Sequence, residues 1–252
     1  MADISLNDPW GLSFIALSLL LGGILKGATG AGMPIIAVPV VAAVYDVRLA
    51  VILLVVPNFL TNLWQLLRYR EQELERGFTA SFALSGAVGA GFGTFFLVWL
   101  PGTLLNLLMT AVVVIYIAMR LLKPTLQIPI DRARKTAWMA GGSGGLLQGA
   151  LGISAPVAIT FLSAVKLPRP TFIFTVSVYF ATMCLTQFSV QVHQGLLTWH
   201  IAALGAAALI PMLMGMPVGE WIGRRMGPVM FDRIILAMLA CLALKQVWDV
   251  FA

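Results

Sequence analysis

Long apolar runs, separated by short clusters of basic residues, occupy most of this chain. Of its 252 residues 60% are hydrophobic and only 10% are charged, whereas ordinary soluble domains carry about 25% charged residues. This number of charged side chains is too small to cover the surface of a soluble domain of this size. Lipid must therefore cover the remaining surface. We therefore predict an all-α polytopic membrane protein of the inner (plasma) membrane.

Ten apolar segments are expected, and two of them are unusually short. The short segments, 33–45 and 155–165, cannot cross a bilayer at 1.5 Å per residue, since a helical span needs about 20 residues. Each follows a glycine-rich break that ends in a proline, Pro34 or Pro156. We read both as interrupted helices, which gives about 8 to 10 membrane segments. The other segments are 10–26, 49–67, 78–99, 102–122, 136–150, 171–192, 200–219 and 229–248.

The two breaks belong to an internal repeat. Seven of the thirteen residues in 22–34 are identical to those in 144–156, and the same shift places Gln65 on Gln187. Repeated membrane segments of this kind are typical of secondary transporters. We predict an N-terminal half at 10–122, a basic cytoplasmic loop at 123–135 and a C-terminal half at 136–250.

The positive charges distinguish two topologies, because Lys and Arg near span ends collect on the cytoplasmic side. If each broken segment crosses once, the two faces carry nine and six basic residues. If each is a hairpin that returns to its starting side, thirteen lie on one face and only Arg48 and Lys245 on the other. We favour the second model, in which two inverted repeats each contain a broken-helix hairpin and three transmembrane helices. Both chain ends are then extracytoplasmic.

The breaks predict an anion site. A helix that ends inside a bilayer leaves backbone groups that only protein or a cavity can satisfy. Each returning half-helix is expected to begin near its proline, with Ser154 as an N-cap. Helix N-termini carry partial positive charge and attract anions. The candidate residues at the breaks are Gly27, Thr29, Gly30, Gly32, Gly152 and Ser154.

Lys26 lies one residue before the first break, in a run with no other charge. Placing a lysine at the bilayer centre costs at least about 2.5–3.5 kcal/mol, so such residues usually have a function. We interpret Lys26 as a cation that pairs with an anionic substrate, with its repeat partner Gln148 as a neutral hydrogen-bonding counterpart. The alternative is that the side chain snorkels to the interface.

Polar side chains at helical spacing form a stripe on segment 49–67, comprising Asn58, Thr61, Asn62 and Gln65. The stripe either lines a substrate path or bonds neighbouring helices. A weaker stripe of the second half has Gln187 as its best candidate. The other members of that weaker stripe are Ser177, Cys184 and Gln191.

Two further patterns have structural interpretations. The GxxxG pairs that begin at Gly89 and Gly215 predict close helix contacts, and they would also permit a homodimer. Glu220 lies beside Arg224 and Arg225, which indicates a cytoplasmic ion pair; a proton-coupling carboxylate is the alternative.

Several classes of function are disfavoured. The basic clusters lack interleaved aromatic residues, so we expect no nucleic acid as a partner. Cys184 and Cys241 lie in apolar runs without ligand spacing, so we expect no metal and no cofactor. An intramembrane enzyme would need a positioned base or nucleophile pair, and no such pair is evident. The expected partners are a small anionic substrate and the lipid bilayer.

The motifs at 25–39 and 145–156 resemble those of the TauE/SafE sulfite exporter family, and the resemblance covers nearly the whole chain. One departure is Ile153-Ser154, where many members carry further glycines. The resemblance implies transport of sulfur-containing anions such as sulfite, sulfoacetate and other organosulfonates, and in some members small carboxylates. We therefore expect a secondary transporter that exports such an anion by alternating access around a midplane site. The alternatives are an anion channel or uniporter, a small-carboxylate transporter and, with less support, an intramembrane enzyme.

Overall fold

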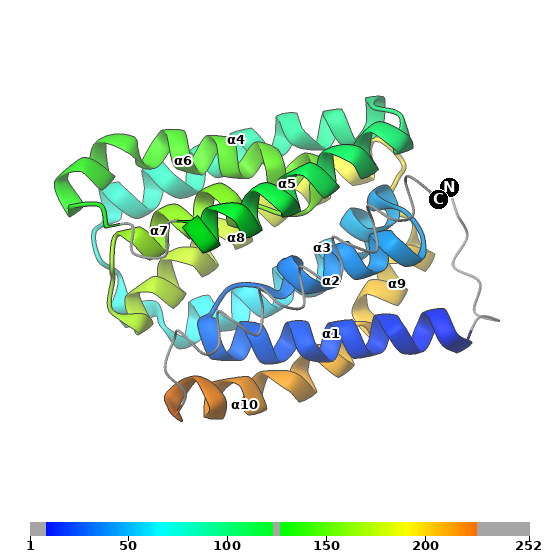
Figure 1. Cartoon of the computed structure of the whole chain (residues 1–252), viewed down its shortest axis with the longest axis horizontal. Helices are drawn as coiled ribbons and strands as arrows, with labels where there is room; N and C mark the ends of the chain where they lie inside the picture. The colour runs from blue at the N-terminus through cyan, green and yellow to red at the C-terminus, as the bar shows by residue number, and fades with distance from the viewer. Residues whose placement is uncertain (1–8, 123–126, 226–252) are drawn as a thin grey trace.

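The computed structural model describes residues 9–122 and 127–225, and all regular structure in these ranges is helical (Figure 1). The segment 229–248 lies outside the described residues. The elements, in chain order, are α1 (Pro9–Thr29), α2 (Met33–Val44), α3 (Val47–Arg68), η1 (Arg70–Gln72), α4 (Arg76–Trp99), α5 (Gly102–Leu122), α6 (Ile130–Leu151), η2 (Ala155–Ile159), α7 (Thr160–Ala164), α8 (Arg169–His193), α9 (Trp199–Ala207) and α10 (Leu209–Arg225).

Long apolar helices confirm the prediction of an all-α protein that crosses the membrane several times. Within the described ranges, six stretches are long and apolar enough to cross a bilayer, and α2 and η2–α7 are the expected short segments. α6 begins at Ile130, inside the stretch expected to be a loop, because the basic residues of 132–135 form its first turns. The six stretches are Trp10–Thr29, Val47–Arg68, Arg76–Trp99, Gly102–Met119, Arg169–His193 and Trp199–Gly223.

Both glycine-rich breaks occur where the sequence predicts them. α1 ends before Gly30 and Gly32, whose φ angles of 81° and 116° are left-handed and favour glycine. α2 then starts with Pro34 in its first turn and packs back along α1. Gly152, with φ 73°, ends α6 in the same way, and η2 starts with Pro156 in its first turn.

The expected cap at the second break is wrong. Ser154 occupies the N-cap position of η2, but its side chain makes no capping hydrogen bond. Pro156 has no N–H to donate, and the N–H groups of Val157 and Ala158 donate to the backbone oxygen of Ser154 instead. The first turn is π-helical, and the Thr160 hydroxyl donates to the Ala155 oxygen five residues earlier (3.0 Å).

The segment expected at 200–219 consists of two helices. α9 ends at Ala207, and α10 begins at Leu209. Pro211 explains the interruption, because it lacks the N–H that would bond the carbonyl of Ala207 and its ring crowds that carbonyl. Both helices still belong to one apolar stretch of 25 residues.

The basic connections gather at one end of the helical bundle. The α3–α4 and α7–α8 connections and the start of α6 lie together, whereas the α2–α3, α4–α5 and α8–α9 connections lie at the opposite end (Figure 1). An ion pair between Arg134 and Glu75 (2.8 Å) and a hydrogen bond from the Ile128 N–H to the Ala164 oxygen (2.9 Å) join the basic connections. The returning-hairpin interpretation expects this grouping. Lys123, Arg233 and Lys245 lie outside the described residues.

Two glycine-lined seams hold the bundle together. α4 packs closely on α6, and α1 packs closely on α10. A Cβ atom at Gly93 would collide with the backbone of Leu146, and one at Gly219 would collide with the backbone of Ile24. The prediction that the GxxxG pairs make close helix contacts is therefore confirmed. Both glycine faces pack against helices of the same chain. The homodimer that they would permit stays a prediction.

Candidate functional site

Lys26 is buried on α1, one turn before the first break. Only 1% of the residue is exposed, so its side chain does not reach the surface as snorkelling would require. Its Nζ donates to the Asn62 Oδ1 at 2.8 Å and lies 6.0 Å from the centre of the Phe180 ring. Within residues 9–122 and 127–225 no carboxylate forms an ion pair with it. Lys26 is thus a buried amino group held by a neutral amide.

Asn62 and Asn58 extend this contact across α3 to α8. The Asn62 Nδ2 donates to the backbone oxygen of Asn58 (2.7 Å) and to its Oδ1 (2.8 Å). The Asn58 Nδ2 in turn donates to the Cys184 Sγ at 3.4 Å. The four side chains form one buried polar chain from α1 to α8, which we call the Lys26 cluster: Lys26, Asn62, Asn58 and Cys184.

The two polar stripes meet along the seam between α3 and α8. The Ser177 hydroxyl donates to the Gln65 Oε1 (3.4 Å), and the Asn58–Cys184 contact lies two turns farther along the same seam. Positions that rise along α3 fall along α8, so the helices are antiparallel. Every member of both stripes is buried, including the α8 residues that looked weaker from sequence alone.

The second break contributes to the same region. Gln148 is buried, and its backbone oxygen accepts a hydrogen bond from the Gln187 Nε2 at 3.3 Å. A cavity of about 10 Å³, large enough for one water, is lined by Pro34 of the first break, Gly152 of the second, and Asn58, Gln148 and Gln187. The structure therefore brings the two breaks together beside the Lys26 cluster, as the repeat predicts.

Three buried side-chain polar groups of the second half, one of them on the cavity-lining Gln148, have no hydrogen-bond partner among the described residues. They are the Gln148 Oε1, the Ser154 hydroxyl and the amide of Gln191, and all three residues are buried. Gln191 lies one turn beyond Gln187 on α8. Polar groups buried in this way are normally satisfied, so they indicate a place for a polar ligand or water.

The remaining candidates at the first break shape the chain locally. The Thr29 hydroxyl bonds the backbone oxygens of Leu25 and Ala31, so it stabilises the break itself. A Cβ at Gly30 would collide with Ile173, and a Cβ at Gly32 would collide with Leu25. These close contacts explain the small residues without any contact to a ligand.

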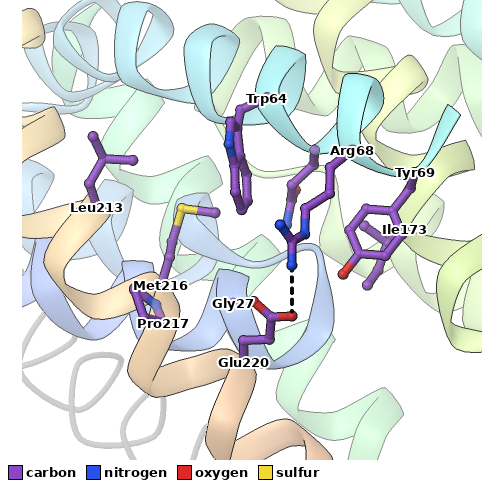
Figure 2. Close-up of a pocket in the computed structure, with 10 residues that line it drawn as sticks. Gly27, Trp64, Arg68, Tyr69, Ile173, Leu213, Met216, Pro217 and Glu220 are labelled. Carbon is purple, nitrogen blue, oxygen red and sulfur yellow. Dashed lines mark ion pairs between the residues drawn. The ribbon is translucent and has the colours of Figure 1, made fainter.

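Gly27 and Gln65 line a second, larger cavity of about 180 Å³ at the end of the bundle that carries the basic connections (Figure 2). Sequence reasoning missed Arg68 as a residue of this cavity. The Arg68 Nη2 lies 3.5 Å from the Glu220 Oε1, so the ion pair expected at Glu220 includes a residue of α3. One signal was present, because Arg68 follows Gln65 by three residues and extends the stripe on α3.

Arg169 was also missed, and no local signal could have found it. Its Nη2 donates to the backbone oxygens of Gly27 (3.2 Å) and Ala28 (3.1 Å), more than 140 positions earlier in the chain. A cation there satisfies carbonyls at the C-terminal end of α1 and complements the negative end of the helix dipole. Arg169 therefore fixes the end of the helix that carries Lys26.

The Lys26 cluster has the chemistry that an anion site would need. A buried ammonium surrounded by amides and apolar rings attracts negative charge strongly, because the local dielectric constant is low. In the part of the chain that the structure describes, no three His, Cys, Asp or Glu side chains gather as metal ligands would.

The sequence as a whole matches a known family. The family described as sulfite exporter TauE/SafE matches residues 15–246. No curated protein and no solved structure matches the chain. The match covers nearly all of the 252 residues and both glycine-rich breaks. The chain belongs to the sulfite exporter TauE/SafE family of membrane transporters.

Proposed function

We propose that the protein is a secondary transporter that exports a small sulfur-containing anion, such as sulfite, sulfoacetate or another organosulfonate, across the inner membrane. Membership of the TauE/SafE family supports the transporter class. The observation that carries the proposal is the buried Lys26, whose hydrogen-bond partner is the neutral Asn62. A buried charge without a counter-ion is unfavourable, and a bound anion supplies that counter-ion.

The binding site that we propose is built around the Lys26 cluster. Lys26 neutralises the anion, while Asn62 and Asn58 orient the ammonium and offer further polar contacts. α2 begins beside the cluster, so its N-terminus adds partial positive charge. The full set, which includes Thr29, Gly30 and Gly32 as residues that shape the first break, comprises Lys26, Gly27, Thr29, Gly30, Gly32, Asn58, Asn62, Gln65, Gln148, Gly152, Ser154 and Gln187.

The mechanism that we propose is alternating access between two inverted halves. Equivalent packing supports this, because α1 lies on α10 just as α6 lies on α4. The cavities differ between the two ends of the α3–α8 seam, with about 180 Å³ beside Gln65 and about 10 Å³ beside Gln187. We infer a conformation open toward the basic end. A membrane potential negative inside then favours export by about 2.3 kcal/mol per charge per 100 mV.

The decisive experiment measures anion binding by thermal shift in the purified protein and in Lys26→Gln. The panel contains sulfite, sulfoacetate, isethionate, taurine, sulfate and short carboxylates. A ligand that binds the folded state raises Tm by mass action, so we expect a sulfur anion to raise the Tm of the wild type and not that of the variant. Lys135→Gln is the matched control, because Lys135 is an exposed lysine on α6.

Counterflow in proteoliposomes then separates the alternatives. A transporter shows saturable exchange of labelled anion, whereas a channel shows conductive flux without exchange. If Lys26→Gln binds the anion as well as the wild type does, Lys26 is not part of the binding site. A Tm rise with carboxylates alone would change the substrate class.

A further inference from the structure

The larger cavity lies between the ends of α1, α3 and α10, close to the start of α8. Its volume of about 180 Å³ corresponds to about a dozen waters, which is ample for a small oxyanion. Figure 2 shows Arg68 and Glu220 facing each other across it, with the Tyr69 ring beside them. Its walls are largely apolar, and they include Trp64, Ile173 and Met216.

The ion pair in this cavity is loose. The Arg68–Glu220 separation of 3.5 Å exceeds the usual 2.7–2.9 Å of a charge-assisted hydrogen bond, and the two side chains are 49% and 23% exposed. Pairs of this kind contribute little to stability. The Arg134–Glu75 pair at the same end of the bundle is tight by comparison, at 2.8 Å. Another oxyanion can therefore replace the Glu220 carboxylate on Arg68 at little cost.

The cavity ends where the Lys26 cluster begins. Gly27, which follows Lys26 directly, forms part of its lining. Gln65 also lines the cavity and lies three residues from Asn62, a distance of about 4.5 Å along α3. Arg68 is six residues from Asn62 on α3, so an anion on Arg68 lies within about two helical turns of the buried site.

We infer that this cavity is a separate anion-binding vestibule. Arg68 binds the oxyanion group of the substrate first, and the Glu220 carboxylate occupies Arg68 until the anion displaces it. The planar guanidinium suits this exchange, because it binds carboxylate, sulfonate and sulfite oxygens through paired N–H groups. The inference rests on the proposed function, since the vestibule supplies the Lys26 site.

Trp64 provides a direct optical signal of vestibule binding. Its ring lies 5.4 Å from the Arg68 guanidinium carbon. The change in fluorescence on titration with sulfite, taken as the difference between the full-length protein and its Trp64→Phe variant, reports an anion beside Arg68. We expect Glu220→Gln to tighten this binding about fivefold, because it removes the resident competitor. We expect Arg68→Gln to weaken it at least about tenfold, and Arg68→Lys to weaken it less.

Transport kinetics separate the vestibule from the central site. Arg68→Gln should raise the KM for sulfite with kcat largely retained, because Lys26 remains in place. Lys26→Gln should abolish transport yet keep the Trp64 signal. Glu75→Gln is the matched control, because it breaks the ion pair outside the cavity, and it should leave both readouts unchanged.

Each opposing result has a distinct meaning. If the sulfite affinity measured from Trp64 fluorescence is unchanged in both Glu220→Gln and Arg68→Gln, the vestibule proposal is overturned while the proposed function stays intact. An equal change in sulfite affinity in Glu75→Gln and Glu220→Gln would also overturn it, because the change would then come from the lost negative charge and not from the position of Glu220. Wild-type transport by Lys26→Gln would overturn the proposed function whatever Arg68 does.

Discussion

The Lys26 ammonium of α1 donates a hydrogen bond to the side-chain oxygen of Asn62 on α3, across 2.8 Å in the buried interior. The same amide donates its two N–H groups toward Asn58, so its orientation is fixed by both partners. Asn62 is therefore the side chain that positions Lys26.

Replacing Asn62 by leucine should damage both binding and stability. The change leaves the buried ammonium without its acceptor, which costs about 1–3 kcal/mol, and it frees Lys26 to rotate. We expect a lower Tm and a raised apparent KM for the transported anion. Unchanged transport with a lowered Tm would instead show that the stripe on α3 only bonds neighbouring helices. Thermal denaturation and proteoliposome uptake of the same preparation provide the comparison.

The glycine seam between α4 and α6 should not tolerate a single added methyl group. A Cβ at Gly149 would lie 2.7 Å from the Thr94 nitrogen and 2.8 Å from the Gly93 Cα, both of which are backbone atoms. We expect Gly149→Ala to destabilise the protein by about 1–3 kcal/mol through overpacking. Gly102→Ala serves as the control, because nothing lies within 4 Å of its added carbon. Equal Tm values for the two variants would contradict close packing at this seam.

Sequence reasoning predicted the local features of the fold well. The glycines that precede Pro34 and Pro156 identify the breaks. Glycine readily adopts a left-handed φ, which ends one helix, and proline is favoured in the first turn of the next. The stripes on α3 and α8 follow helical periodicity, so their burial was also predictable. These features depend on residues that are neighbours in the chain.

Features that depend on which helices pack together could not be predicted. Glu220 bonds Arg68 because α10 lies near α3, and Arg169 bonds Gly27 because α8 starts where α1 ends. No local sequence pattern predicts that α10 lies near α3 or that α8 starts beside the end of α1. The missing cap at Ser154 has a local cause, since Pro156 removes the N–H that the hydroxyl would accept.

Removing the Arg169 side chain should loosen the end of α1. Its two hydrogen bonds to the carbonyls of Gly27 and Ala28 are charge-assisted, and hydrogen bonds of this kind contribute about 1.5–3 kcal/mol. We expect Arg169→Ala to lower Tm and to weaken anion binding, because α1 carries Lys26. Arg48→Ala is the matched comparison, since Arg48 donates to the carbonyl of Leu97 in α4 and to that of its C-cap residue Leu100, at the other end of the bundle. It should lower Tm alone. Equal losses of binding in both variants would contradict a specific role for Arg169.

Cysteine labelling tests the predicted orientation in the membrane. In a background with Cys184 and Cys241 replaced by alanine, we expect Gln194→Cys to react with an impermeant maleimide in intact cells. Lys135→Cys should react only after the membrane is permeabilised. Both positions are exposed. The α8–α9 connection, which contains Gln194, and the start of α6, which contains Lys135, lie at opposite ends of the bundle (Figure 1). The reverse pattern would place the basic end outside the cell and both termini in the cytoplasm.

The seam between α1 and α10 has a consequence for biosynthesis. α1 is synthesised long before α10, the helix that covers its glycine face, which begins about 180 residues after α1 ends. Until α10 has been synthesised, α1 lies in the membrane without its packing partner and with Lys26 incompletely enclosed. We therefore expect neither half to mature alone, and two fragments separated between α5 and α6 to assemble only when they are synthesised together. Quality control of this protein then acts only after α10 has been synthesised, because the glycine face of α1 has no partner before that.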